Sequence, residues 1–98
     1  MVLEYELAKR GLTVRRQVSI PIHYDELQFD EGFRADLIVH DRVLVELKSV
    51  AQLSAVHRKQ LQTYLRLAGL RLGYLLNFGV ALLRDGIVRA VNGLPDDP

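Results

Sequence analysis

Apolar residues follow a helical spacing at the start of the chain and again in its second half. Near the start, the pattern predicts a helix within residues 2–10, because Leu3, Leu7 and Arg10 share one face and Gly11 suits a left-handed helix end. The second helix is predicted between Ser54, a good N-cap, and Gly69. Its apolar and semi-polar positions are Val56, Leu61, Tyr64, Leu65 and Ala68.

Between these helices the periodicity changes to that of strands. Residues 13–22 alternate apolar and polar positions, and Pro21 favours an exposed end or an edge for this strand. A polar loop is predicted over residues 23–31. Two apolar, β-branched runs then predict a hairpin. These runs are residues 33–39 and 43–47, joined by a turn at 40–42.

The last third of the chain adds further strands. The continuous apolar run 72–78 predicts a strand covered on both faces. Residues 81–83 and 87–91 predict a terminal hairpin, and residues 94–98 a frayed tail. The expected fold is therefore α/β, in the order helix, three strands, helix, strand, terminal hairpin.

Composition narrows the class of protein. A length of 98 residues predicts a single domain over residues 1–98, and 49% apolar residues can fill a small core. There is no cysteine, so thiol catalysis and cysteine-ligated metals are excluded. No apolar run reaches the length of about 18 residues that spans a bilayer, and the first residues lack a signal pattern, so we expect a cytoplasmic protein without membrane contact. A formal charge of +1 gives no argument for nucleic acid.

Charged residues nevertheless gather on the predicted hairpin. With a turn at 40–42, residues whose numbers sum to 82 lie opposite each other, so Asp36 faces Glu46. Alternation then places Arg34 and Lys48 on the same face. Ala35, Leu37, Val43, Val45 and Leu47 are expected on the other face.

Two opposed carboxylates need a counter-charge. At about 5 Å they repel by roughly 3 kcal/mol with an effective dielectric near 20. A Mg²⁺ ion would neutralise them, since it prefers oxygen ligands and commonly takes one or two carboxylates. Lys48 could then act on the attacking water or on phosphoryl oxygens, which indicates phosphodiester cleavage. The alternative is a checkerboard of exposed salt bridges in which Arg34 and Lys48 pair with the acids.

The predicted second helix carries polar groups that could assist such a site. Gln60 and Tyr64 lie four residues apart on one face, and His57 precedes Gln60 by three. They could bind a phosphate or brace a metal site. The alternative is that Tyr64 is a core aromatic residue with its hydroxyl at the rim, and that His57 is a solvated residue of the first turn.

Together these segments resemble the GxxExxY proteins of the PD-(D/E)xK nuclease superfamily. The similarity covers almost the whole chain, and its most specific part is the combination of short motifs. These are Asp36 followed by Glu46-Leu47-Lys48, the pair Gln60 and Tyr64, and Leu72-Gly73 with Asn77-Phe78-Gly79.

The resemblance implies a restriction-endonuclease-like fold, in which a mixed β-sheet is flanked by helices. It implies that Asp36, Glu46 and the backbone carbonyl of Leu47 bind Mg²⁺ or Mn²⁺, and that Lys48 is the catalytic lysine. Gln60 and Tyr64 match a helix motif that some nucleases of this superfamily carry beside the active site. Nucleic acid is the implied partner.

One departure from the family pattern leaves two hypotheses open. The signature Gly-x-x-Glu-x-x-Tyr is not found, and residues 1–7 match the stretch just after it. Glu4 or Glu6 could replace an acidic residue of that segment. A homodimer could cover the apolar surface of the sheet that the segment would otherwise bury. The chain is expected to be a metal-dependent nuclease or a degenerate relic of one. The alternative is a non-catalytic nuclease-fold module that binds a protein or nucleic acid.

Overall fold

The computed structural model describes residues 2–24 and 27–93, so the predicted tail at 94–98 lies outside the described residues. The elements are α1 (Val2–Lys9), β1 (Val14–Tyr24), β2 (Leu27–Val39), β3 (Val43–Lys48), α2 (Ala55–Ala68), β4 (Leu72–Asn77), the 3₁₀ turn η1 (Leu83–Gly86) and β5 (Ile87–Val91). The predicted α/β class and element order are confirmed. No helix among the described residues has the length and apolar character to cross a membrane.

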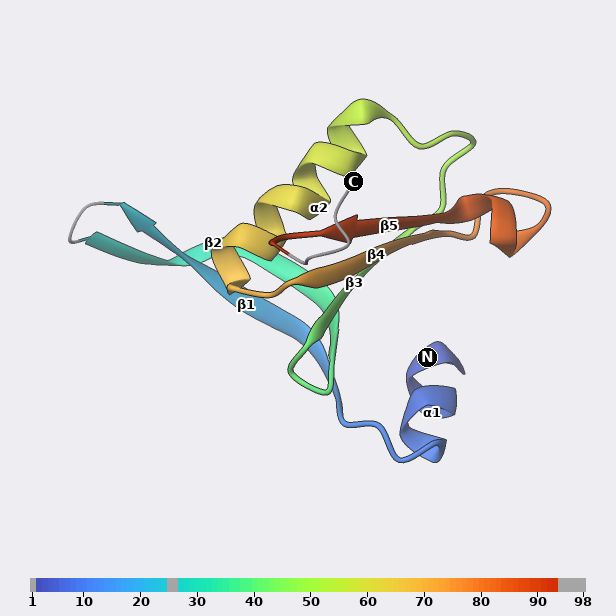
Figure 1. Cartoon of the computed structure of the whole chain (residues 1–98), viewed down its shortest axis with the longest axis horizontal. Coiled ribbons are helices and arrows are strands. Elements are labelled where there is room, and N and C mark those ends of the chain that lie inside the picture. The colour runs from blue at the N-terminus through green and yellow to red at the C-terminus, as the bar shows by residue number, and fades with distance from the viewer. Residues whose placement is uncertain (1, 25–26, 94–98) are drawn as a thin grey trace.

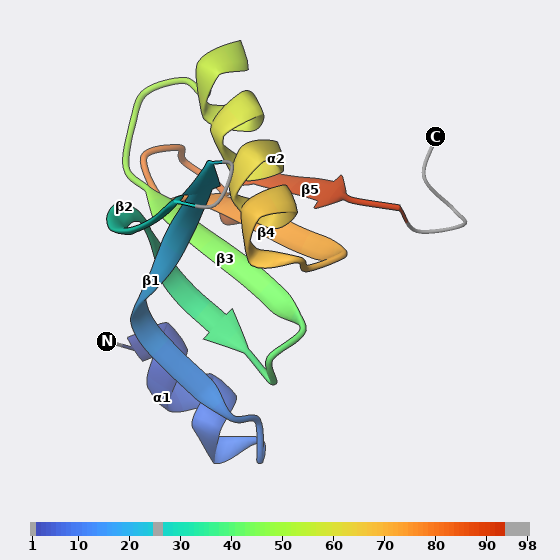
Figure 2. The same cartoon turned by 90° about the vertical axis from the view of Figure 1, so that its left-hand side faces the viewer.

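The five strands form one mixed sheet in the order β1-β2-β3-β4-β5. All neighbours are antiparallel except β3 and β4, which are parallel and therefore need the crossover that α2 provides. The helices cover opposite faces: α2 lies on one side of the sheet and α1 on the other in Figure 1, and the quarter-turn view in Figure 2 agrees.

The first hairpin is longer than the sequence pattern predicts. β1 continues through Pro21 to Tyr24, and β2 already begins at Leu27, so most of the loop predicted over 23–31 is strand. β1 is an edge strand and its register shifts between Ile20 and Ile22, a combination that tolerates the missing N–H of proline. The two strands extend as an arm beyond the rest of the sheet (Figure 1).

The terminal hairpin differs from the predicted one. Residues 81–83 form no strand, and β5 instead pairs antiparallel with β4, with Leu76 opposite Ile87 and Leu72 opposite Val91. Pairing over five positions of β4 satisfies more backbone groups than a three-residue strand could. The predicted strand at 87–91 is confirmed.

Two apolar clusters hold the sheet between the helices. The cluster under α2 consists of Ile20, Ala35, Ile38, Leu44, Leu61, Tyr64, Leu65 and Leu75. The cluster on the α1 side consists of Leu37, Val39 and Val45, with half-buried residues such as Leu3 and Leu7 of α1 packed against it. Val56, predicted as an apolar helix position, is instead exposed.

Helix α2 has well-formed ends that fix its position over the sheet. At its start, the backbone N–H of Ser54 donates to His57 Nδ1 (3.0 Å), while the His57 N–H donates to Ser54 Oγ (3.4 Å), which is a capping box. At its end, Gly69 adopts φ +69°, a left-handed conformation that closes a helix and favours glycine. Both ends agree with the sequence prediction.

Candidate active site

The ladder between β1 and β2 lacks a residue pair at Asp36, although β2 itself is continuous there. On either side of Asp36, Leu37 pairs with Arg16 of β1 and Ala35 pairs with Val18. Gln17 of β1, between these two partners, has φ +50°. The paired part of β2 and β3 ends next to Asp36, at Leu37–Val45. Ala35 and Leu37 therefore belong to different core clusters, which corrects the predicted alternation that put them on one face.

Side chains of the acid pair replace the missing ladder bonds at this interruption. The Leu47 N–H donates to Asp36 Oδ2 at 2.7 Å, and the Asp36 N–H donates to Glu46 Oε1 at 3.2 Å. Each carboxylate thus accepts a backbone hydrogen bond from the opposite strand. Asp36 and Glu46 lie together, as the predicted hairpin register requires.

Glu46 is buried, with 4% of its surface exposed, and its environment disfavours the charged form. Burial and then the negative charge of Asp36 raise the pKa of Glu46 from its ordinary 4.5 to about 7. The hydrogen bond from the Asp36 N–H and the positive charge of Lys48 lower this pKa, but do not cancel the rise. At neutral pH Glu46 is therefore only partly ionised in the folded protein, and a further positive charge beside it would favour the ionised form.

The salt-bridge alternative for these acids is not what the structure contains. Ion pairs within the described part of the chain are Arg10–Glu6, Arg15–Asp41 and Arg16–Glu4. None joins Arg34 or Lys48 to the acid pair. Lys48 is half-buried at the end of β3 and acts on Glu46 through its charge.

Asn77, which the sequence analysis did not propose as a site residue, fixes the chain just after Lys48. It is 1% exposed, and its Oδ1 accepts from the Val50 N–H (3.0 Å) while its Nδ2 donates to the Val50 carbonyl (2.9 Å). The next N–H, that of Phe78, donates to the Lys48 carbonyl (2.9 Å). A polar residue at the end of an apolar strand run is the signal that could have identified it.

Gly79 permits this close approach of two chain segments. A Cβ atom at residue 79 would stand 2.3 Å from the Val50 carbonyl oxygen and 2.6 Å from the Val50 nitrogen, so only glycine fits without a backbone shift. The Gly79 N–H also donates to Asn77 Oδ1 (3.0 Å). Residues 77–79 therefore hold the segment that follows Lys48 in place, and we call this set of contacts the clamp.

We expect Asn77→Ala to destabilise the protein by about 2 kcal/mol, because it leaves the half-buried Val50 N–H and C=O without partners. Urea denaturation would measure this loss. Asn92→Ala is a matched control, since Asn92 makes one side-chain bond, to the Leu70 carbonyl (3.1 Å), and should cost about 1 kcal/mol. Equal losses in the two variants would contradict the clamp.

Helix α2 brings Tyr64 toward the acid pair. Tyr64 is buried, and Gln60 Nε2 donates to its hydroxyl oxygen at 3.1 Å. Burial raises the pKa of Tyr64, and the negative charge of Glu46 raises it further, which places the phenol within electrostatic range of that carboxylate. Its ring also packs against Phe33, with centroids 4.7 Å apart. Tyr64 is thus both a core residue and a neighbour of the acids.

His57 has a structural task that the sequence analysis did not assign to it. Its Nδ1 accepts the Ser54 N–H in the capping box of α2. No hydrogen bond or ion pair in the described part of the chain joins His57 to Asp36, Glu46 or Lys48. The structure therefore groups the two acids, Lys48, Gln60 and Tyr64, and leaves His57 at the helix start.

The oxygen atoms at the interruption suit a hard divalent cation. The N–H and C=O of a strand residue point to the same side, so the Leu47 carbonyl points toward β2 like the N–H that binds Asp36. Within the described residues no three Asp, Glu, His or Cys side chains gather as a metal site. Two carboxylates and one carbonyl match the partial protein ligation typical of Mg²⁺, which keeps positions for water and phosphate.

Comparison with known proteins identifies the superfamily of this chain. Residues 1–90 match the family model described as the PD-(D/E)XK nuclease superfamily. No curated protein and no solved structure gives a significant match. Since the match spans most of the chain and includes both strands that carry the acid pair, the protein belongs to the PD-(D/E)XK nuclease superfamily.

Proposed function

We propose that the protein hydrolyses phosphodiester bonds in nucleic acid with the help of Mg²⁺ or Mn²⁺. The observation that carries the proposal is the convergence of Asp36 and Glu46 at the ladder interruption, where burial and the charge of Asp36 raise the pKa of Glu46 to about 7. Asp36, Glu46 and the Leu47 carbonyl would hold the ion, which would lower the pKa of a water molecule and withdraw charge from the phosphate.

Lys48 would be the catalytic lysine. It ends β3 two residues after Glu46, and residues 77–79 clamp the segment that follows it. From this position its ammonium group can orient the attacking water and donate to a phosphoryl oxygen as negative charge develops there. A fixed backbone on the C-terminal side of Lys48 supports this role, because catalysis needs the donor held close to its working position.

Gln60, Tyr64 and His57 would have supporting roles. The Tyr64 hydroxyl accepts from Gln60 and can donate its own proton to a phosphate oxygen or to a carboxylate of the site. His57 would contribute by fixing the start of α2, from which its ring could also contact substrate. Assignment to the GxxExxY subfamily, a cytoplasmic location and a homodimer stay predictions.

The direct test separates metal binding from cleavage. Wild-type protein is expected to give a saturable Mn²⁺ isotherm in calorimetry and to cleave at least one of four substrates, single- or double-stranded DNA or RNA. Asp36→Asn should lose both, because one of two carboxylate ligands is gone. Asp41→Asn, a change on the exposed turn between β2 and β3, should lose neither.

Two outcomes would contradict the proposal. Cleavage that is equal in wild type and Asp36→Asn would come from a contaminant or another site. Absence of both a metal isotherm and cleavage in the wild type would instead favour the non-catalytic module with a nuclease fold.

A further inference from the structure

An apolar groove lies beside Lys48, between the start of α1 and the ends of β3 and β4. It has a volume of about 610 Å³. Its lining includes Val2, Leu47, Lys48, Leu76, Phe78 and Leu83. Apart from Lys48 and Ser49 the lining is apolar, and Val2, Phe78 and Leu83 are exposed. Leu47 and Leu76 pack on the α1 side of the sheet, whereas Glu46 lies near Tyr64 on the α2 side. Lys48, at the end of β3, is the residue that the groove shares with the surroundings of Glu46.

Phe78 is the most distinctive residue of this groove. About half of its surface is exposed (51%), although it directly follows the buried Asn77. Its backbone is fixed on both sides, because its N–H donates to the Lys48 carbonyl and Gly79 fits closely against Val50. An exposed aromatic ring on a rigid backbone loses little entropy on binding, and suits a flat π-system.

We propose that Phe78 and the groove around it bind an unpaired nucleobase of the strand whose phosphate lies at Lys48. This inference rests on the proposed function and specifies its substrate as single-stranded or locally unpaired nucleic acid. In a duplex the faces of the bases are stacked on each other, so a ring at the groove could reach only a terminal or splayed base.

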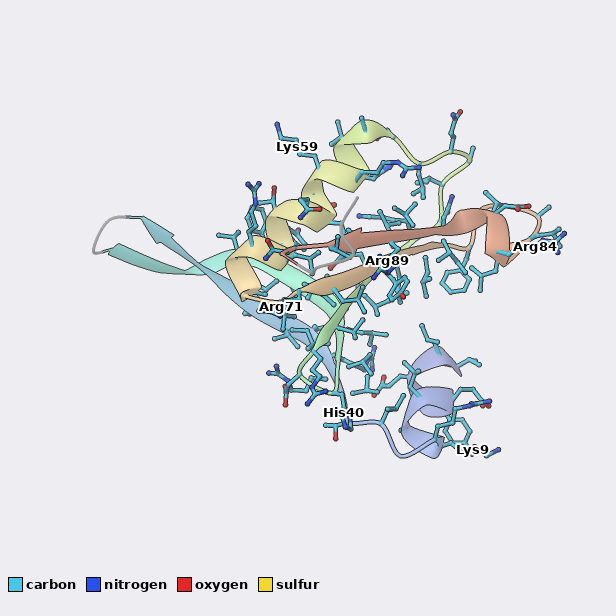
Figure 3. The ribbon with its side chains drawn as sticks, viewed as in Figure 1. Lys9, His40, Lys59, Arg71, Arg84 and Arg89 are labelled. Atoms are coloured by element: carbon cyan, nitrogen blue, oxygen red, sulfur yellow. The ribbon has the colours of Figure 1, made fainter. Side chains whose placement is uncertain are left out.

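The charge at the groove favours this occupant over a second copy of the chain. A nucleic-acid strand brings phosphates to Lys48 as well as bases to the apolar wall, so both kinds of surface are matched. A second copy would bury the Lys48 ammonium, and a two-fold pair would bury two of them. Arg84 directly follows Leu83, and its side chain lies at the outer tip of the molecule rather than in the groove lining (Figure 3).

The test measures binding without metal, in EDTA, so that it does not depend on cleavage. The probe is a 12-nucleotide single strand, DNA or RNA, whichever the wild type binds more tightly, compared with its duplex and with a strand whose bases are replaced by abasic sites. Phe78→Ala should weaken binding of the single strand about tenfold. Binding of the abasic strand should change less than about twofold, since it offers no base to stack.

Two variants control for other effects of the substitution. Phe78→Tyr keeps an aromatic face and should bind like the wild type. Val56→Ala removes an exposed apolar side chain (75% exposed) from α2, on the side of the sheet opposite α1, and should leave binding unchanged. Sedimentation velocity of each variant reports the oligomeric state.

The possible failures can be told apart. Equal weakening of the normal and abasic strands by Phe78→Ala would overturn the nucleobase inference alone, as would a dimer that Phe78→Ala dissociates. A wild type that cleaves nucleic acid but is insensitive to Phe78→Ala would leave the proposed function standing. A wild type that neither binds nor cleaves would overturn both.

Discussion

Lys48→Met is expected to lower the rate of nucleic-acid cleavage about a thousandfold while leaving the Mn²⁺ isotherm intact. The size follows from removing a positioned donor and acid–base group from the reacting centre, which commonly costs two to four orders of magnitude. Metal binding should survive, because the ligands we propose are Asp36, Glu46 and the Leu47 carbonyl. Single-turnover cleavage and calorimetry on the same preparations would measure the two effects.

Lys59→Met is the matched control. It removes the same charge from a lysine that projects from α2 away from the sheet (Figure 3). If Lys59→Met slowed cleavage as much as Lys48→Met, the effect would be one of overall charge on substrate attraction, and Lys48 would have no special role. Loss of the Mn²⁺ isotherm in Lys48→Met would contradict the proposal that Lys48 acts in cleavage and not in metal binding.

The part of the site predicted from sequence rests on local rules. A turn at 40–42 fixes the register of β2 and β3, because each strand residue advances by a constant step, and this alone brings Asp36 opposite Glu46. Capping residues fix α2 in the same way, and with it the pair Gln60 and Tyr64. These features need only the residues of one or two neighbouring elements.

What the sequence did not reveal depends on contacts between distant segments. Gln17 with φ +50° interrupts the ladder beside Asp36, and no local pattern marks that position. Asn77 binds Val50, 27 residues earlier in the chain, through parallel strands whose register the sequence does not specify. Polar residues at 23–31 resemble a loop, yet most of them continue the two strands of the arm.

The free energy of unfolding in metal-free buffer should fall as the pH rises from about 4.5 to about 7, because of Glu46. In the unfolded chain this carboxyl ionises with its ordinary pKa of 4.5, whereas burial and the charge of Asp36 raise its pKa in the folded protein to about 7. Between these values the folded state binds more protons than the unfolded state, so a higher pH favours unfolding. The difference in pKa corresponds to about 3 kcal/mol.

Glu46→Gln should remove this contribution, since an amide does not titrate. Urea denaturation in EDTA at pH 5 and pH 8 would show a difference between variant and wild type that changes by about 3 kcal/mol between the two pH values, in favour of the variant at pH 8. An unchanged difference would mean that Glu46 is ionised in the folded protein throughout this range. We also expect Mn²⁺ added at pH 8 to stabilise the wild type more than Glu46→Gln. The reason is that the ion binds the ionised carboxylate pair, and only the folded chain brings the two carboxylates together.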